Sequence, residues 1–273
     1  MYVVLVFLAI LVILCLLICL SNIPLHRLPS FSSETDRNVY CLMVTSNDPH
    51  RRPFCKLSIR NFKEQSHPHK RLIVMNLSDV PIVSKVDSAD DSILEVFLKQ
   101  NNLTLGEIRN LSLELVPPNA WWTLWDDDDW RSSDYISQLV RWSHGYDFVM
   151  IQNRIEYNIT NGFAYTLTLR TGLMSFFSRR HPLLRYEHVN TKEDVIVKQT
   201  ALRHFKTRVV NNPSHMYIRL IHGKNTSPFV DARKNTVRDT RSHKVYFERE
   251  LRDGERAYLR KILSTKYKHA FAK

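Results

Sequence analysis

The chain of 273 residues is poor in glycine, with only six glycine residues. It contains neither G-x-G-x-x-G nor G-x-x-x-x-G-K-[ST], the two loop patterns that cradle phosphates in dinucleotide-binding proteins and in P-loop NTPases. It also has no internal repeat and no low-complexity tract. The sequence therefore argues against a P-loop kinase or NTPase and against a repeat architecture.

Cysteine is equally scarce. Two of the four cysteines, Cys15 and Cys19, fall in an apolar N-terminal run, which leaves Cys41 and Cys55 for the rest of the chain. Two cysteines make neither a disulfide framework nor a zinc site. We expect Cys41 and Cys55 to be small, buried, apolar side chains.

Charge is absent from the N-terminal run Tyr2–Leu20, YVVLVFLAILVILCLLICL. A membrane-spanning helix needs about 20 apolar residues. A secretory signal has a shorter apolar core of about 7–15 residues, a basic start and a small-residue cleavage site, and the run has none of these. We predict an uncleaved transmembrane anchor over residues 1–21, with a cleaved signal peptide as the alternative, and a linker over residues 22–37.

The orientation of this anchor stays open. Arg27 follows it and no lysine or arginine precedes it, so the positive-inside rule places the bulk of the chain in the cytoplasm. Glycosylation sequons favour a lumenal domain instead; they stand at Asn76, Asn102, Asn110, Asn158 and Asn225. We expect a single-pass membrane protein, in a membrane of the ER or Golgi type if the chain is eukaryotic.

The chain is strongly basic, with a net charge of +12. Its basic residues are spread out, with a mild concentration in residues 233–273, for which we predict a basic, partly helical segment with a helix over residues 247–263. Aromatic residues do not interleave with the basic ones as in an RNA-binding surface, so we expect no nucleic-acid partner. Anionic lipid headgroups or an anionic substrate fit the charge.

Short apolar runs alternate with amphipathic stretches across residues 38–232. This order predicts an α/β domain with a mostly parallel central sheet flanked by helices. The predicted strands cover residues 39–46, 71–76, 121–125 and 146–151. One predicted helix begins at Pro53, and Cys55, Ile59 and Phe62 share one of its faces. Three further helices are predicted over residues 92–100, 105–116 and 133–143.

An acidic run, Asp126–Asp129, directly follows the predicted strand WWTLW. Ligands of parallel sheets bind at the carboxyl ends of strands. Carboxylates gathered there need a cation, and oxygen ligands suit Mg²⁺ or Mn²⁺, which commonly bridge the phosphates of a nucleotide. A solvated acidic loop and a structural calcium site are the alternatives.

This segment resembles the aspartate motif of GT-A glycosyltransferases of the family 2 type, in which a strand ends in D-x-D-D and a helix follows. Some rhamnosyltransferases carry a similar acidic block followed by D-Y-I. Three further segments are similar to the same family between about Val39 and Phe229. They are the first strand, helix and second strand in MVTSNDPHRRPFCKLSIRNFKEQSHPHKRLIVMN, the E-D motif in NTKEDVIVKQTALRHF, and the closing strand in MYIRLIHGKNTSPF.

The resemblance implies a GT-A, Rossmann-like fold and a metal site. It makes Asp126 and Asp128 the D-x-D pair, with Asp128 on the metal and Asp126 on the metal or the ribose. Asp129 is a further metal candidate, whereas Asp127 is expected to face elsewhere. His222 would be another ligand of the metal or the diphosphate, and imidazole suits Mn²⁺ better than Mg²⁺.

The same resemblance implies that Asp194 is the general base, with Glu193 as the alternative. Two acidic residues at a helix start also suit the helix dipole without any catalytic role. The remaining expected contacts are to the nucleotide and its diphosphate, and they come from Arg109, Asn110, Asp126, Arg219 and Lys224. Asp79 stands near the place of an acidic pair that the family carries after its second strand and that is missing here.

The function that the resemblance implies is a membrane-anchored, Mn²⁺- or Mg²⁺-dependent, inverting glycosyltransferase. It would move a hexosyl or deoxyhexosyl group from a nucleotide-diphosphate sugar to a hydroxyl of a glycan, glycoprotein or glycolipid. Two alternatives stay open. One is a metal-dependent phosphoryl or nucleotidyl transferase, and the other is a non-enzymatic, membrane-anchored binding module with a structural calcium site.

Overall fold

The computed structural model describes residues 38–84, 90–98, 102–159, 162–169, 175–223, 225, 246–249 and 259. The predicted anchor over residues 1–21, the linker over residues 22–37 and most of residues 233–273 lie outside this part. Within the described residues, no helix combines the length and the apolar character that a membrane crossing requires.

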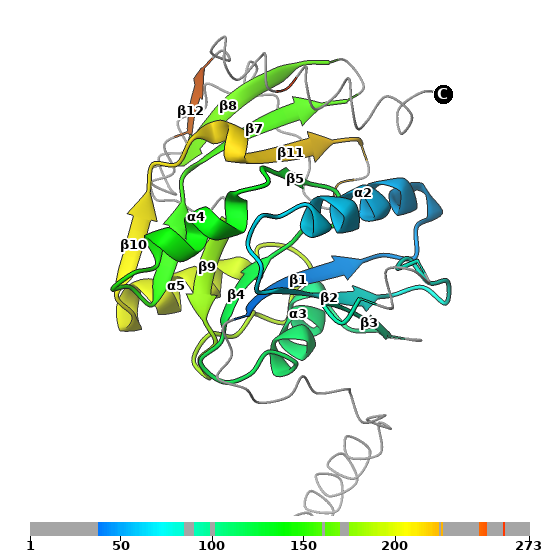
Figure 1. The fold of residues 1–273 in the computed structure, drawn as a ribbon, viewed down its shortest axis with the longest axis horizontal. Coiled ribbons are helices and arrows are strands. Elements are labelled where there is room, and N and C mark those ends of the chain that lie inside the picture. The colour runs from blue at the N-terminus through cyan, green and yellow to red at the C-terminus, as the bar shows by residue number, and fades with distance from the viewer. Residues whose placement is uncertain are drawn as a thin grey trace, which may run out of the picture. The chain divides into compact units, whose positions relative to one another are not determined.

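A seven-stranded sheet forms the centre of the domain (Figure 1). Its strands, in spatial order, are β10 (Thr207–Val210), β6 (Phe148–Ile151), β9 (Ser175–Arg179), β4 (Trp121–Leu124), β1 (Val39–Thr45), β2 (Lys70–Asn76) and β3 (Ile93–Phe97). Neighbours pair in parallel except around β9, which is antiparallel to both β4 and β6. The prediction of a mostly parallel sheet is therefore confirmed.

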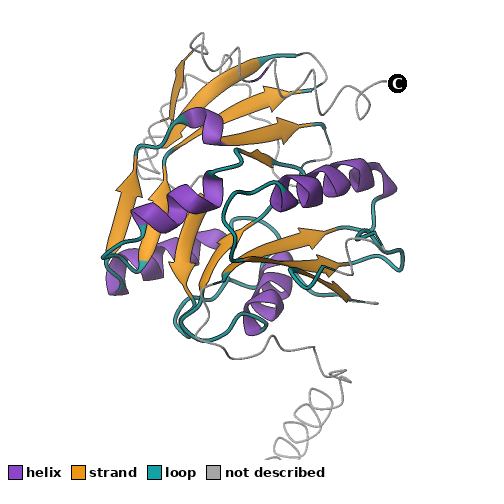
Figure 2. Cartoon of the chain, in the orientation of Figure 1, coloured by secondary structure: helices purple, strands orange, loops and turns teal. Residues whose placement is uncertain are grey.

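Helices flank this sheet, as Figure 2 shows. They are α2 (Arg52–Lys63), α3 (Leu105–Glu114), α4 (Tyr135–Trp142) and α5 (Asp194–His204), with short 3₁₀ turns at Pro49–Arg51 and Ser214–Met216. The face predicted for α2 from periodicity is buried as expected, since Cys55, Ile59 and Phe62 are at most 3% exposed. The predicted strands beginning at residues 39, 71 and 121 are confirmed within one or two residues.

A second sheet of five strands, in the order β12-β8-β7-β11-β5, completes the described part. Its strands are β5 (Trp130–Arg131), β7 (Asn153–Asn158), β8 (Ala164–Leu169), β11 (Tyr217–Ile221) and β12 (Tyr246–Arg249). β5 directly follows the acidic run and pairs with the start of β11. This pairing brings Asp126–Asp129 alongside the strand that leads to His222.

One helix prediction is wrong, and a second is wrong at its start, although Leu259 within it is helical. Residues 93–97 of the predicted helix 92–100 form strand β3, because Ile93 and Val96 pack into the core while the segment pairs in parallel with β2. The carboxylate of Glu95 also accepts hydrogen bonds from the Asn76 side chain (2.7 Å) and the Ile82 N–H (2.9 Å). Residues 247–249 of the predicted helix 247–263 belong to β12, which pairs antiparallel with β8.

Both cysteines of the domain are free and fully buried, as expected. Burial raises the pKa of the Cys41 thiol to about 12, so it stays protonated. Cys55 is more than an apolar filler, because its thiol lies 2.9 Å from the Thr45 hydroxyl and donates to the carboxylate of Asp127 at 3.2 Å.

Helix α3 is joined closely to the segment that leads into α5. A Cβ atom on Gly106 would lie 1.7 Å from the Glu187 carbonyl oxygen, so only glycine permits this approach. One turn later, the Asn110 side chain accepts from the Tyr186 N–H (2.9 Å) and donates to its carbonyl (3.0 Å). Helix α3 therefore positions residues 186–190, which precede the E-D motif.

We expect Gly106→Ala to destabilise the fold by about 1–3 kcal/mol, as overpacking does, although alanine normally stabilises a helix relative to glycine. Urea unfolding measures the change. Gly145→Ala is the matched control: its φ is 75°, but its added Cβ meets nothing within 4 Å, so it adds backbone strain without a clash. A Gly106→Ala protein as stable as the wild type would show that α3 does not pack this closely.

Candidate active site

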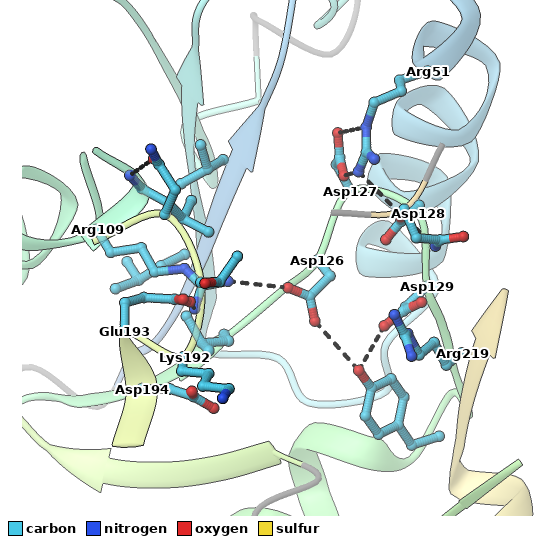
Figure 3. Close-up of a pocket in the computed structure, with 18 of the residues that line it drawn as sticks. Arg51, Arg109, Asp126, Asp127, Asp128, Asp129, Lys192, Glu193, Asp194 and Arg219 are labelled. Carbon is cyan, nitrogen blue, oxygen red and sulfur yellow. Dashed lines mark hydrogen bonds and ion pairs between the residues drawn. The ribbon is translucent and has the colours of Figure 1, made fainter. Parts of the chain in front are cut away.

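A pocket of about 340 Å³ opens at the carboxyl ends of β1 and β4. Figure 3 shows Arg109, Lys192, Glu193 and Asp194 on one side, Arg51, Asp127, Asp128 and Arg219 on the other, and Asp126 between them. The structure thus brings together the acidic run, the E-D motif, and two of the predicted nucleotide contacts, Arg109 and Arg219. The four aspartates have four different environments.

Asp127 turns toward the start of α2. Its carboxylate forms a bidentate ion pair with the guanidinium of Arg51 and accepts from Cys55. Burial and the neighbouring charge of Asp128 raise the pKa of Asp127, while Arg51 opposes the shift. The Arg51 side chain, which follows β1, was not anticipated from the sequence. It also reaches Asp128 at 3.0 Å.

Asp128 is the aspartate that meets His222. Its Oδ2 lies 3.0 Å from the His222 Nε2 and accepts from the Asn225 amide at 3.2 Å. Burial alone would raise the pKa of Asp128, but the hydrogen bond from His222 and the charges of Arg51, His222 and Arg219 outweigh it and lower that pKa. The His222 ring is 3% exposed and lies behind Asp128, stacked on Phe54 with ring centroids 4.4 Å apart.

Asp129 points into the protein. Its Oδ2 lies 2.5 Å from the Tyr217 hydroxyl, and its Oδ1 accepts from the Leu220 N–H at 3.2 Å. Burial, followed by the charges of Asp128 and Asp126, raises the pKa of Asp129 to about 8. Its contacts tie the acidic run to β11, which makes it a support of the site.

Asp126 is the most accessible of the four, with a third of its side chain exposed. Arg109 lies 3.5 Å from one of its oxygens, and Arg131 and the Tyr217 hydroxyl lie 3.4 and 3.3 Å from the other. The side chain is therefore held by two cations while part of it still faces the pocket.

Arg131 is a fully buried cation that sequence reasoning missed. Its guanidinium lies over the rings of Trp125 (4.6 Å), Tyr217 (4.8 Å) and Tyr135 (5.6 Å), and it donates to the Leu124 carbonyl at 3.3 Å. Cations are attracted to the faces of aromatic rings. This aromatic enclosure holds a positive charge beneath Asp126 and Asp129, where it lowers their mutual repulsion.

The other wall of the pocket carries the E-D motif at the start of α5. Glu193 is buried and forms an ion pair with Arg109; burial raises the pKa of Glu193, and Arg109 opposes that shift. Asp194 lines the same pocket, yet no described residue makes a hydrogen bond or ion pair with its carboxylate. Of the two acids, Asp194 is therefore the one with oxygens available to a substrate.

Three residues expected at the nucleotide do not line the pocket. Asn110 clamps Tyr186, and Asp79 is exposed in the loop after β2. Lys224 lies outside the described residues. Conversely, Arg154 and Tyr217 line the pocket without having been anticipated, because isolated residues within strands carry no recognisable motif.

Asp128 and His222 offer ligand atoms that fit a divalent metal ion whose coordination shell is completed by a substrate. Within the described residues, no three His, Cys, Asp or Glu side chains form a ready-made metal cage. An octahedral ion with ligands at about 2.1 Å places neighbouring donor atoms about 3.0 Å apart, and the Asp128 Oδ2 and His222 Nε2 are separated by 3.0 Å. Mg²⁺-type ions typically take one or two protein ligands and the phosphates of a substrate.

We expect the stability of Asp129→Asn, relative to the wild type, to rise between pH 5 and pH 8. The folded pKa of Asp129 is about 8, above its ordinary value of about 4. Its contribution to stability is therefore complete below pH 4 and is lost as the pH rises through 8. Urea unfolding at both pH values, without divalent metal, measures the difference, and the exposed Asp91→Asn is the control. An unchanged difference would contradict the assignment.

No protein-family model and no curated protein matches the sequence. Among solved structures, residues 1–349 of TarS from S. aureus match with 14% identity and a TM-score of 0.53, over 67% of this chain and 60% of that one. A further TarS structure matches with 13% identity and a TM-score of 0.52, over 67% and 37% of the two chains.

The mannosyltransferase PcManGT from Pyrobaculum calidifontis, in complex with GDP-Man and Mn²⁺, matches with 12% identity and a TM-score of 0.50, over 69% of this chain and 58% of that one. The chain thus spans less than two thirds of the length of the matched chain in each of these three structures. At such identities the likeness concerns the fold. The described chain has a GT-A-like glycosyltransferase fold, as its motifs predict.

Proposed function

We propose that the protein is a metal-dependent glycosyltransferase that uses a nucleotide-diphosphate sugar. The observation that carries this proposal is the placing of two chemically different features in one pocket of a GT-A-like fold. One is Asp128, whose carboxylate lines the pocket and pairs with the buried His222 behind it, a pair that would suit a divalent ion; the other is the unpaired carboxylate of Asp194. That PcManGT was solved with GDP-Man and Mn²⁺ is consistent with this donor and metal.

The donor would lie along the wall formed by the acidic run. Asp128 and His222 would hold Mn²⁺ or Mg²⁺, and the ion would supply positive charge to the diphosphate as it leaves. Asp126, with its exposed edge, is placed to accept hydrogen bonds from the ribose. Arg51 binds Asp127 and Asp128 together and so fixes the direction in which Asp128 presents its oxygens.

The acceptor would approach from the wall that carries Asp194. Its hydroxyl oxygen attacks the anomeric carbon on the face opposite the diphosphate, the bond from that carbon to the phosphate oxygen breaks, and Asp194 takes the hydroxyl proton. A single displacement of this kind inverts the anomeric centre. Glu193 is the weaker candidate for the base because its carboxylate is already bound to Arg109.

The two alternative functions find less support in the site. A two-metal phosphoryl or nucleotidyl transferase needs carboxylates that hold two ions about 4 Å apart. A structural calcium site needs six to eight oxygen ligands. The carboxylates of Asp127 and Asp129 are instead bound to Arg51 and Tyr217.

The wider setting of the reaction belongs to the same proposal. The apolar run Tyr2–Leu20 would anchor the enzyme to a membrane, and the acceptor would be a glycan, glycoprotein or glycolipid. The transferred group would be a hexosyl or deoxyhexosyl residue.

We expect the purified protein to bind one class of UDP-, GDP- or dTDP-sugar only in the presence of Mn²⁺ or Mg²⁺. Asp128→Ala should abolish this metal-dependent binding because it removes the carboxylate that pairs with His222. Asp79→Ala, the same substitution at an exposed aspartate outside the pocket, should leave binding unchanged. Calorimetric titration measures both. A folded protein that binds none of these donors would rule the proposal out.

Asp194→Asn should bind the donor as the wild type does but turn over about 10²–10⁴-fold more slowly, because the amide cannot accept the acceptor proton. Single-turnover sugar transfer, compared with donor affinity in the same preparation, separates the two effects. If the variant retained the wild-type rate, Asp194 would not be the base.

A further inference from the structure

The positive charges that line the pocket differ sharply in their pairing. They are Arg51, Arg109, Arg154, Lys192 and Arg219. The four arginines are held by protein carboxylates: Arg51 by Asp127 and Asp128, Arg109 by Glu193, and both Arg154 and Arg219 by Glu156. Within the described part of the chain, Lys192 is the one of these cations whose side chain makes no hydrogen bond or ion pair.

Lys192 also has an unusual backbone. Its φ is 62°, in the left-handed region, which lysine rarely adopts without support from the surrounding structure. Here the turn is held from both sides. The Gly106 N–H donates to the Val189 carbonyl (3.1 Å), and the Leu105 N–H donates to the Asn190 side chain (3.0 Å). After the turn, the Val195 N–H donates to the carbonyl of Lys192 itself at 3.1 Å.

This turn places Lys192 at the wall of the pocket, next to Glu193 and Asp194 (Figure 3). Its ammonium carries three rotatable donors on a flexible stem, the form in which lysine commonly binds phosphate. Asp194, two residues later, lies in the same pocket but makes no ion pair with it. The amine therefore remains available to a ligand that enters the pocket.

The balance of charge in the pocket indicates that an anionic ligand needs an unpaired cation. Six carboxylates line the pocket (Asp126, Asp127, Asp128, Asp129, Glu193 and Asp194) against five cations. A nucleoside diphosphate adds further negative charge, and Asp128, the proposed metal ligand, lies on the side of the pocket opposite the E-D motif (Figure 3). A diphosphate held between the two sides would meet Lys192 as a cation that does not first have to leave a carboxylate.

We propose that Lys192 binds the phosphate oxygens of the nucleoside diphosphate and so supports its departure from the sugar. This inference rests on the proposed function, since it names a further contact of the same donor. The left-handed turn has a role in it: it sets Lys192 at the wall of the pocket, directly before α5 begins. The four arginines are bound to carboxylates of the protein, whereas Lys192 supplies a positive charge to the ligand.

The test is calorimetric binding of UDP, GDP and dTDP to the full-length protein with Mn²⁺, in the wild type, Lys192→Asn and Lys192→Arg. Asparagine tolerates the left-handed conformation, so it removes the charge while keeping the turn. We expect Lys192→Asn to weaken binding of the preferred diphosphate about 10- to 100-fold, as loss of a charge-assisted hydrogen bond does. It should also flatten the salt dependence of binding, while Lys192→Arg stays close to the wild type.

Thermal unfolding of the three proteins accompanies the titrations. Unchanged diphosphate affinity in Lys192→Asn would overturn the inference while leaving the proposed function standing. Equal losses in Lys192→Asn and Lys192→Arg would also overturn it, because they would show that the turn depends on lysine for a structural reason. If the wild type itself bound no diphosphate, the proposed function would fail first, and the inference with it.

Discussion

The repulsion among four consecutive aspartates at the end of β4 is the constraint on which this site depends. Three arginines from different parts of the chain reduce it. Arg51 enters from the turn after β1, Arg109 from α3, and Arg131 from β5 inside an aromatic enclosure. Each cation is fixed by the element that carries it, so the packing of the sheet and helices is also what keeps the carboxylates together. The acidic run is therefore largely compensated within the protein.

This compensation divides the site into supports and working groups. Asp127 and Asp129 are bound to Arg51 and Tyr217 and face the protein. Asp126 keeps an exposed edge, and Asp128 presents its oxygens beside His222. The opposite wall repeats the pattern, because Glu193 is bound to Arg109 whereas Asp194 is not paired within the described residues. Each wall thus combines carboxylates bound to the protein with at least one that keeps oxygens toward the pocket, which suits a donor on one side and an acceptor on the other.

The sequence predicts the features that depend on local patterns. Buried runs and helical periodicity identify β1, α2, β2 and β4, and the aspartate block marks the edge of the sheet. Local patterns fail where a neighbouring strand determines the secondary structure. ILEVF, for example, forms a strand because it pairs with β2 and because Glu95 binds Asn76. The second sheet was not predicted for a similar reason, since NRIEYN offers only Ile155 and Tyr157 as alternating apolar residues. Arg51 and Arg131 look like surface charges in the sequence, and only the fold joins Arg51 to an aspartate 76 positions away.

The central claim is that one divalent ion, held by Asp128 and His222, joins the protein to a diphosphate. Pulsed electron paramagnetic resonance of Mn²⁺ bound to the protein with its preferred nucleoside diphosphate tests this most directly. The account predicts a nitrogen coupling from one imidazole, lost in His222→Ala, together with phosphorus couplings from the diphosphate. Mn²⁺ that shows phosphorus couplings but no histidine nitrogen, or the same nitrogen signal in His222→Ala, would contradict it.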